Sequence, residues 1–431
     1  MNFYEMIKKQ DSGKIALIEE EQEYTYGDLV EKVMECSQKE ELFPEKTGIH
    51  VIQRQRILEQ LLEFFASSIR GLVPLIIPYD AKVSKNTLQQ VPVPESACMA
   101  VMTSGTTGEP KVLFRRYESW ADFFPVQNKI FGIDEESRLF AQGSLAFTGN
   151  LNLYMAQFFA GATVIAQNAF APKDWVRILR QTKANAVYLI PSKLMCIPKV
   201  MKKNQSPLPQ VRTILAGSQS LGQQEAASLK QCFPKGRIVL YYGASELNYI
   251  TYVTDEAMNT EKNLIGKPFP GVKVFVKDHE IFVDTPYHVE GIIPPCTLSD
   301  QGYFDQEGNL YFDGRSDEIL NIHGRKVSAV RVENALQSLP EIKKAGVILQ
   351  TEKERPILTA FIELEEDWTE QEIRPIKTEE MIERLKKTLA DYELPRKIIT
   401  LPLLPTTESG KVDKKRLKNG NQIDNKQKPI V

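Results

Sequence analysis

The feature that most constrains the fold is an alternation of short apolar runs with amphipathic, helix-like segments through most of the chain. Residues 57–71 carry leucine, isoleucine and phenylalanine at helical spacing and end in glycine, and the apolar run of residues 72–80 follows directly. Strands that alternate with helices are typical of layered α/β proteins. We therefore predict the α/β class, with a large, layered N-terminal domain.

The alternation can be followed along the chain. Two short strands are expected within residues 14–26, and a helix over residues 25–37. The hydroxyl of Thr25 is suited to cap that helix, because it can accept a hydrogen bond from an N–H group of the first turn. Further helices are expected at residues 121–133 and 174–184. Further strands are expected at residues 161–167, 186–191, 213–218 and 237–246.

The character of the sequence changes twice in the last 170 or so positions. Residues 266–313 contain short strands and turns, which predict a small β piece that closes the large domain. A compact α+β domain is expected after it, with helices and strands at residues 329–339, 344–350, 356–364 and 379–392. The predicted organisation is an N-terminal domain, a small C-terminal domain and a polar tail, at residues 1–314, 315–420 and 421–431.

Composition excludes several classes of protein. A chain of 431 residues is long for one core, and 42% hydrophobic with 26% charged residues is ordinary for a globular protein. The net charge of −2 gives no sign of a nucleic-acid partner. Five cysteines, none in a CxxC pair, favour reduced thiols and a cytoplasmic location over a disulfide framework or a zinc ribbon. The first 14 residues lack the apolar core of a signal peptide.

One long segment, residues 139–172, contains no charged residue. A membrane span needs about 20 mostly apolar residues, and polar side chains such as Gln142, Asn150 and Gln157 interrupt this segment. We expect a buried helix and strand there, and no membrane span.

A glycine-rich loop lies in the stretch MTSGTTGEPKV, residues 102–112. The runs on either side both have the character of strands, so the loop differs from a Walker A loop, which joins a strand to a helix. Hydroxyls, backbone N–H groups and one ammonium suit a polyphosphate. A surface hairpin rich in Ser, Thr and Gly is the alternative. The candidate phosphate-binding residues are Thr103, Ser104, Gly105, Thr106, Thr107, Gly108 and Lys111.

This loop and four later segments, in order, resemble the signature motifs of the adenylate-forming superfamily of acyl-CoA synthetases, adenylation domains and luciferases. The later segments are YYGASE at 241–246, LSDQGYFDQEGNLYFDGR at 298–315, GRSDEILNIHGRKV at 314–327 and PTTESGKVDKKRL at 405–417. The resemblance implies a two-step reaction. A carboxylate attacks the α-phosphorus of ATP to give an acyl-adenylate and pyrophosphate, and an acceptor, often a thiol, then attacks the activated carbonyl.

The resemblance also implies roles for particular residues. Lys411 is the expected catalytic lysine, which would neutralise charge that develops in the first step. Glu246 is the second expected catalytic residue and a ligand for Mg²⁺, a hard cation that prefers oxygen. Taken alone, an exposed lysine and a surface glutamate would be the ordinary interpretations of these two positions.

The nucleotide would need an aromatic face and an acceptor for a diol. Tyr242 is expected to stack on adenine, with Gly217 and Ser218 on the other side; strand alternation lets only one of Tyr241 and Tyr242 face the site. Asp300 is expected to accept from the ribose hydroxyls. The expected adenine and ribose residues are Gly217, Ser218, Tyr242, Gly243, Asp300 and Arg315. A salt-bridged turn is the alternative for Arg315 and Asp317.

The second step would follow a swing of the C-terminal domain about a hinge at Asp317. The loop around Gly324 would then reach the site, where the missing side chain leaves room for a phosphopantetheine arm. CoA is the first expected acceptor and a carrier protein the alternative; Arg325 and Lys326 suit either.

The chain departs from the family where the acid would bind, in the stretch GSLAFTGNLNLY. Relatives that activate amino acids carry an aspartate after the phenylalanine, and Thr148 stands there instead. A neutral acyl or aryl acid is therefore expected, with Phe147, Thr148, Gly149 and Asn150 as the candidate acid pocket. Ser299 replaces a glycine that the family carries before its aspartate, a change expected to be tolerated because Asp300 is kept.

The predicted function is an ATP-dependent and Mg²⁺-dependent acid–thiol ligase, most similar to acid–CoA ligases. The alternative is a stand-alone ligase that loads the phosphopantetheine of a carrier protein. A non-catalytic relative that binds nucleotide is a further alternative, disfavoured because Lys411, Glu246 and Asp300 are all present. Nothing in the sequence points to a luciferase-like oxidase.

Overall fold

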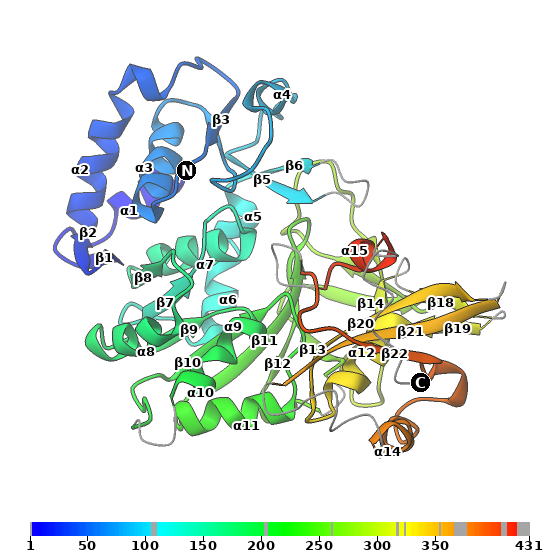
Figure 1. The fold of residues 1–431 in the computed structure, drawn as a ribbon. Coiled ribbons are helices and arrows are strands. Elements are labelled where there is room, and N and C mark those ends of the chain that lie inside the picture. The colour runs from blue at the N-terminus through cyan, green and yellow to red at the C-terminus, as the bar shows by residue number, and fades with distance from the viewer. Residues whose placement is uncertain are drawn as a thin grey trace.

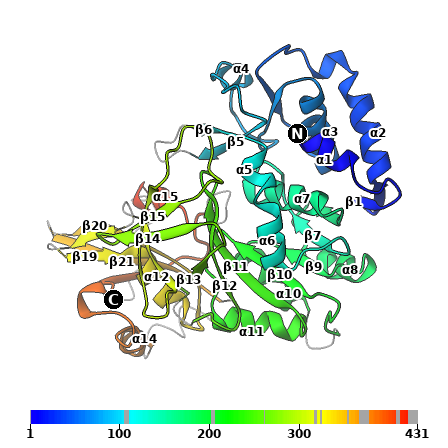
Figure 2. The same ribbon diagram turned by 180° about the vertical axis from the view of Figure 1, so that it is seen from behind.

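The computed structural model describes residues 2–104, 110–201, 206–259, 262–315, 319–322, 325–352, 355–365, 377–406 and 412–419. It has a large N-terminal α/β part and a smaller C-terminal α+β part, so the predicted fold class is confirmed. Figures 1 and 2 show the C-terminal elements on the side of the molecule away from helices α1 to α3.

A thirteen-stranded sheet organises the N-terminal part. Strands β7 to β11 are parallel at its centre, and β12 to β17 extend it in antiparallel fashion. The small β piece expected near residues 266–313 is therefore a continuation of the main sheet. The strands run, in spatial order, as β14 (Lys273–Lys277), β15 (Glu280–Asp284), β16 (Cys296–Phe304), β17 (Leu310–Arg315), β13 (Leu264–Pro268), β12 (Asn248–Thr254), β11 (Arg237–Ala244), β10 (Thr213–Gly217), β9 (Ala186–Tyr188), β7 (Arg138–Gln142), β8 (Thr163–Gln167), β1 (Ile15–Glu19) and β2 (Gln22–Thr25).

Helices cover both faces of this sheet because successive strand residues point to opposite sides. On β7, for example, Leu139 joins one buried cluster and Phe140 the other. The first cluster includes residues of α1 (Phe3–Lys8), α2 (Tyr26–Ser37), α3 (Ile57–Ile69), α5 (Glu118–Ala121), α6 (Phe124–Phe131) and α7 (Thr148–Phe159). The second includes residues of α8 (Pro172–Gln181), α9 (Pro191–Leu194), α10 (Cys196–Val200) and α11 (Gln223–Cys232).

The local signals in the sequence explain several element boundaries. Thr25 accepts a hydrogen bond from the backbone N–H of Asp28, and the Asp28 carboxylate accepts one from the backbone N–H of Thr25. This reciprocal pair confirms the predicted cap of α2. The uncharged segment forms the expected helix and strand, α7 and β8, and also most of a further strand, β7; no described helix is both long and apolar enough to cross a membrane.

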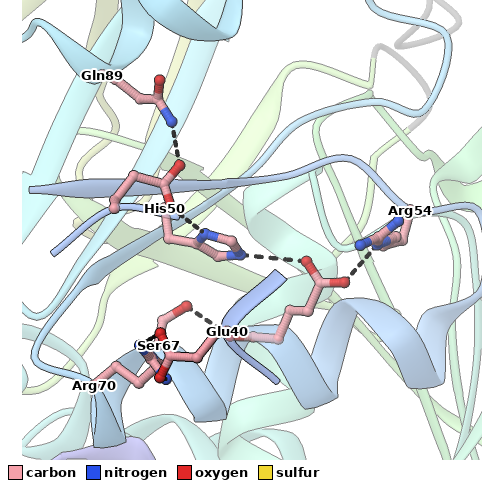
Figure 3. Close-up of polar contacts among 8 residues, drawn as sticks. Glu40, His50, Arg54, Ser67, Arg70 and Gln89 are labelled. Carbon is pink, nitrogen blue, oxygen red and sulfur yellow. Dashed lines mark hydrogen bonds and ion pairs between the residues drawn. The ribbon is translucent and has the colours of Figure 1, made fainter. Parts of the chain in front are cut away.

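A second, four-stranded sheet carries the glycine-rich loop. Its strands are β3 (Ile49–Ile52), β4 (Val73–Ile76), β5 (Met99–Ser104) and β6 (Pro110–Arg115), with α4 (Lys85–Gln89) and the short η1 (Glu40–Leu42) beside it. Buried His50 of β3 links two carboxylates, with Nδ1 3.2 Å from Oε2 of Glu45 and Nε2 3.3 Å from Oε2 of Glu63 (Figure 3). Gln89 donates to Glu45 and Arg54 donates to Glu63, so one polar network connects three elements of this region.

The C-terminal part has buried clusters of its own. Met381, Leu385 and Leu389, at helical spacing within residues 379–392, are buried there, although the helix itself ends at Leu385. Its elements are β18 (Ile319–Ile322), β19 (Arg325–Ser328), α12 (Ala329–Gln337), β20 (Ile342–Glu352), β21 (Arg355–Leu364), α14 (Lys377–Leu385), η3 (Asp391–Glu393), β22 (Lys397–Thr400) and α15 (Lys414–Asn419). The domain boundary between residues 314 and 315 stays a prediction.

Candidate functional site

The glycine-rich loop connects two antiparallel strands, as the sequence predicted. Thr103 of β5 lies directly opposite Lys111 of β6. Opposed residues of an antiparallel pair point to the same face, so the half-buried Thr103 and the exposed Lys111 stand together at the mouth of the loop. Ser104 pairs with Pro110 through its backbone. The other predicted loop residues, Gly105, Thr106, Thr107 and Gly108, lie outside the described residues.

The two adjacent tyrosines of β11 face different surroundings, as alternation predicted. Tyr241 is 6% exposed, and its hydroxyl lies 2.8 Å from that of Tyr188 on β9. The hydroxyl of Tyr242 instead donates to Oδ2 of Asp300 on β16, and the Tyr242 ring lies 5.9 Å from that of Phe312. Tyr242 is therefore the tyrosine that is grouped with the predicted ribose residues.

Asp300 is only 4% exposed, and each oxygen of its carboxylate has a side-chain partner. Nε of Arg315, from β17, lies 3.2 Å from Oδ1, and the hydroxyl of Tyr242 occupies Oδ2. Burial and the adjacent Asp300 carboxylate raise the pKa of Tyr242 well above its usual value, so its hydroxyl remains a donor at neutral pH. A carboxylate oxygen can accept more than one hydrogen bond, which is why a carboxylate suits a diol.

The segment after β10 approaches the tyrosines from the neighbouring strand. A Cβ on Gly217 would lie 2.3 Å from Cζ of Tyr241, so only glycine lets the Tyr241 ring pack there. Ser218 follows with a φ of 67° and is exposed. Gly243 is half-buried in β11, directly after Tyr242. The carboxyl ends of β10 and β11 thus gather four predicted nucleotide residues, at the edge where open α/β sheets bind ligands.

Glu246 is half-buried in the turn between β11 and β12. Sequence patterns did not single out Arg115, a neighbour whose side chain holds this turn. Arg115, at the end of β6, is fully buried. Its guanidinium donates to the carbonyls of Ser245 at 2.6 Å and Tyr287 at 3.0 Å. Burial lowers the pKa of Arg115 to about 9, and the Glu246 carboxylate partly offsets that effect. Arg115 therefore ties the turn that carries Glu246 to the hairpin of the glycine-rich loop.

The predicted acid-pocket residues surround the start of α7. Phe147 is 37% exposed at the N-cap, and Oγ1 of Thr148 accepts from Oγ of Ser245 at 3.1 Å. That contact joins the candidate acid pocket to the turn of Glu246. Buried Asn150 donates to the carbonyl of Ser144 at 3.0 Å, which fixes the turn before the helix.

Tyr188, which the sequence did not single out, lies at Gly149 together with Tyr241. A Cβ on Gly149 would lie 2.5 Å from the hydroxyl oxygen of Tyr188 and 3.0 Å from that of Tyr241. The tyrosine pair therefore packs directly against the helix that carries the candidate acid pocket. This packing depends on contacts between distant segments. In the sequence, the one indication of it was the tyrosine that ends the strand run AVY.

Three predicted residues, Lys411, Asp317 and Gly324, lie outside the described residues. The segment that contains Lys411 is bordered by an antiparallel bridge between Thr406 and Val412, and Val412 packs on Gly346 of β20. Arg325, at the start of β19, is exposed and its guanidinium lies 4.9 Å from the centre of the Tyr392 ring.

Comparison with known proteins identifies the family. The sequence profile described as AMP-binding enzyme matches residues 40–293, and that described as AMP-binding enzyme C-terminal domain matches residues 331–411. Together they cover more than half of the chain. The chain belongs to the AMP-binding enzyme family. The resemblance to adenylate-forming enzymes is confirmed, and so is the prediction of an acid–thiol ligase.

Individual relatives are distant. An uncharacterised acyl–CoA ligase, YhfT, of Bacillus subtilis is 25% identical over 83% of this chain and 76% of the relative. The D-alanine–D-alanyl carrier protein ligase of Lactococcus lactis is 26% identical over 75% of this chain and 70% of the relative. The o-succinylbenzoate–CoA synthetase of Bacillus subtilis, solved with ATP and magnesium, has a TM-score of 0.80 and 18% identity, over 97% of this chain and 99% of the other. The last comparison shows a shared fold.

Proposed function

We propose that this protein activates a carboxylic acid with ATP and Mg²⁺ and transfers the acyl group to a thiol. In the first step a carboxylate oxygen bonds to the α-phosphorus and pyrophosphate leaves. In the second step the thiol sulfur bonds to the acyl carbon and AMP leaves. The observation that carries the proposal is the buried Asp300 carboxylate, held by the Tyr242 hydroxyl and by Arg315.

Nucleotide recognition would use groups that are already oriented. The Tyr242 ring would offer a face to adenine, with Gly217 and Ser218 opposite and Gly243 beside it. Asp300 would accept hydrogen bonds from the ribose hydroxyls, and Arg315, half-exposed, would assist. The phosphate groups would lie against Thr103, Lys111 and the loop between them.

A half-buried carboxylate is a suitable ligand for Mg²⁺, and Glu246 would hold the ion beside the phosphate groups. When bound, the ion would supply positive charge that offsets charge on the phosphates. Lys411 would act at the bond-forming centre in the first step. Arg115 would keep the Glu246 turn in position without contacting the reactants.

The acid would lie against Phe147, Thr148, Gly149 and Asn150. Because the hydroxyls of Tyr188 and Tyr241 crowd Gly149, the tyrosine pair would limit how far an acyl chain can extend past α7. A short acid fits this arrangement better than a long fatty acid. Thr148 carries no charge, which is consistent with an acid that lacks an α-ammonium group.

CoA is the proposed acceptor, and a carrier-protein phosphopantetheine is the alternative. Domain alternation about Asp317 would bring Gly324 to the site for the second step, with the N-terminal domain at residues 1–314, the mobile domain at 315–420 and the tail at 421–431. The exposed guanidinium of Arg325 is available to a phosphate of CoA or to an acidic carrier surface. One relative is a D-alanine–D-alanyl carrier protein ligase, which supports the alternative.

We further propose that the enzyme works in the cytoplasm, on small molecules, with no nucleic-acid partner. All five cysteines are free thiols. Unpaired cysteines are usual in reducing compartments, where ATP and CoA are also available.

The test is pyrophosphate release from ATP and Mg²⁺ with a panel of carboxylic acids, each with and without CoA. The panel includes fatty, benzoic, hydroxybenzoic and dicarboxylic acids. Release that one acid triggers and CoA accelerates would support the CoA ligase. Release that stops near one equivalent with CoA present would favour a carrier protein. The Glu246→Gln variant is the control, and equal release from it would contradict the proposed role of Glu246.

A further inference from the structure

A lysine that the proposed function does not yet use lies beside the candidate acid pocket. Lys193 belongs to α9, which follows β9, and α9 is fixed to the segment after β10 by the bond from the backbone N–H of Ser192 to Oε1 of Gln219 at 2.9 Å. That segment begins with Ser218, directly after Gly217, the last residue of β10. Lys193 therefore lies at the same edge of the sheet as the predicted nucleotide residues.

The surroundings of Gly143 locate the ammonium of Lys193. A Cβ on Gly143 would lie 3.2 Å from Nδ2 of Asn150 and 3.6 Å from Nζ of Lys193. Gly143 directly follows β7, and β7 pairs in parallel with β9. Lys193 and the pocket residue Asn150 thus meet at the carboxyl ends of two neighbouring parallel strands, where ligands of such sheets bind.

The Lys193 ammonium is partly withdrawn from water. Lys193 is half-buried, and among the described residues no carboxylate forms an ion pair with it. Burial lowers its pKa, and Cys196 is the one neighbour that opposes this shift. A partly desolvated charge without an ionic partner destabilises the folded state, and an anionic ligand in the neighbouring candidate pocket would offset that cost.

We infer that Lys193 binds a second carboxylate of the acid substrate, so that the preferred substrate is a short dicarboxylic acid. This rests on the proposed function and names its substrate class. One carboxylate would react with ATP while the other pairs with the Lys193 ammonium. The tyrosine pair at Gly149 limits the length of the acid, and Lys193 selects its distal charge.

The test compares acids of equal length that differ only at the distal end: butanoate, butanedioate and the monoamide of butanedioate. The wild-type enzyme is expected to prefer butanedioate in kcat/KM over both others. Lys193→Met should lower kcat/KM for butanedioate by about 10–100-fold, the range of a hydrogen bond to a charged group, and leave butanoate nearly unchanged. Lys193→Arg should keep much of the preference. Lys173→Met, on the exposed start of α8, is the matched control and should change neither.

Thermal unfolding gives a readout that does not need turnover. Lys193→Met should raise Tm of the free protein, because it removes an unpaired, half-buried charge. Butanedioate should raise Tm of the wild type but not of Lys193→Met. A lower Tm for Lys193→Met in the free protein would mean that the lysine already has a partner and would overturn the inference.

The outcomes separate this inference from the proposed function. No pyrophosphate release with any acid would count against the function itself. Release with butanoate that equals or exceeds release with butanedioate would keep the function and refute the role of Lys193. An equal loss on mono- and dicarboxylic acids in Lys193→Met would also refute it, because the lysine would then act on the reacting carboxylate or the nucleotide.

Discussion

The hydroxyl of Tyr242 donates to Oδ2 of Asp300, across the space between β11 and β16. This bond joins the parallel centre of the sheet to its antiparallel extension, and Arg315 completes it from β17 at 3.2 Å. Three residues from three strands are therefore oriented before any nucleotide arrives. Such preorganisation lowers the cost of ordering side chains during binding.

Replacement of Asp300 should weaken ATP binding more than it weakens the fold. Asp300→Asn keeps the shape but removes the charge and one acceptor site, so we expect KM for ATP to rise by about 10–100-fold. Steady-state kinetics with ATP varied at saturating acid would measure it. Asp284→Asn, at the end of β15 with a half-exposed side chain, is the control. An unchanged KM for ATP would mean that Asp300 acts only in the fold.

Replacement of Arg115 should alter both stability and the response to Mg²⁺. Arg115→Met leaves the carbonyls of Ser245 and Tyr287 without their donor, and we expect a loss of about 3 kcal/mol in the free energy of unfolding. If Arg115 positions the turn of Glu246, the variant should also need more Mg²⁺ for half-maximal activity. The neighbouring Arg116→Met removes a partly exposed ion pair with Glu290, and should cost less than about 1 kcal/mol.

Lys411 should matter in one half-reaction only. Lys411→Ala should slow adenylate formation by about 10²–10³-fold, the scale for loss of one group that stabilises developing charge. Transfer to the thiol from supplied acyl-adenylate should persist, because a different loop would serve that step. Rapid-quench assays of each half-reaction would separate them. Equal losses in both would contradict the division between Lys411 and Gly324.

Local patterns predicted many of the strands and helices and the hairpin of the glycine-rich loop, because each of these rests on periodicity, caps and turns within a short segment. The grouping of Tyr242, Asp300 and Arg315 came from the resemblance to a family. Spacing alone did not bring these residues together, since they are up to 73 positions apart in the sequence. Roles given to Lys411, Asp317 and Gly324 stay predictions.

Local sequence patterns did not predict which polar residues are buried or what surrounds them. Arg115 reads as a charged strand end, and nothing near it indicates that Ser245 and Tyr287 supply its partners. Tyr188 and Lys193 look like an ordinary strand residue and an ordinary surface lysine. Their surroundings come from chain segments tens of residues away, so only the folded arrangement shows that they are desolvated and lie near α7.

The network around His50 should make stability depend on acid pH. Burial raises the pKa of Glu63, but hydrogen bonds from His50 and Arg54 outweigh it and hold the pKa below its ordinary value. A depressed pKa means that the stabilising effect is present above the unfolded-state pKa, about 4.3, and is lost as pH falls through the folded-state value. Glu63→Gln should therefore cost about 1–3 kcal/mol at pH 7 and progressively less below pH about 4.

Urea unfolding at several pH values would measure this difference. Glu59→Gln, on the exposed side of the same helix, is the control and should show little effect at any pH. A penalty for Glu63→Gln that does not shrink with acid would mean that the charge of Glu63 is not what stabilises the network.

Ser299 adopts a backbone conformation that suits glycine, with a φ of 63°, immediately before Asp300. A side chain in this left-handed region costs roughly 1–2 kcal/mol, whereas glycine avoids that cost but loses about 0.4–1 kcal/mol to its freer unfolded chain. Ser299→Ala and Ser299→Gly both lack the hydroxyl, so the difference between their free energies of unfolding does not include its loss. The glycine variant should be the more stable of the two by about 0.5–1 kcal/mol in urea unfolding. At a position with ordinary φ the order is reversed, so an alanine variant as stable as the glycine variant would show that the turn before Asp300 is not strained.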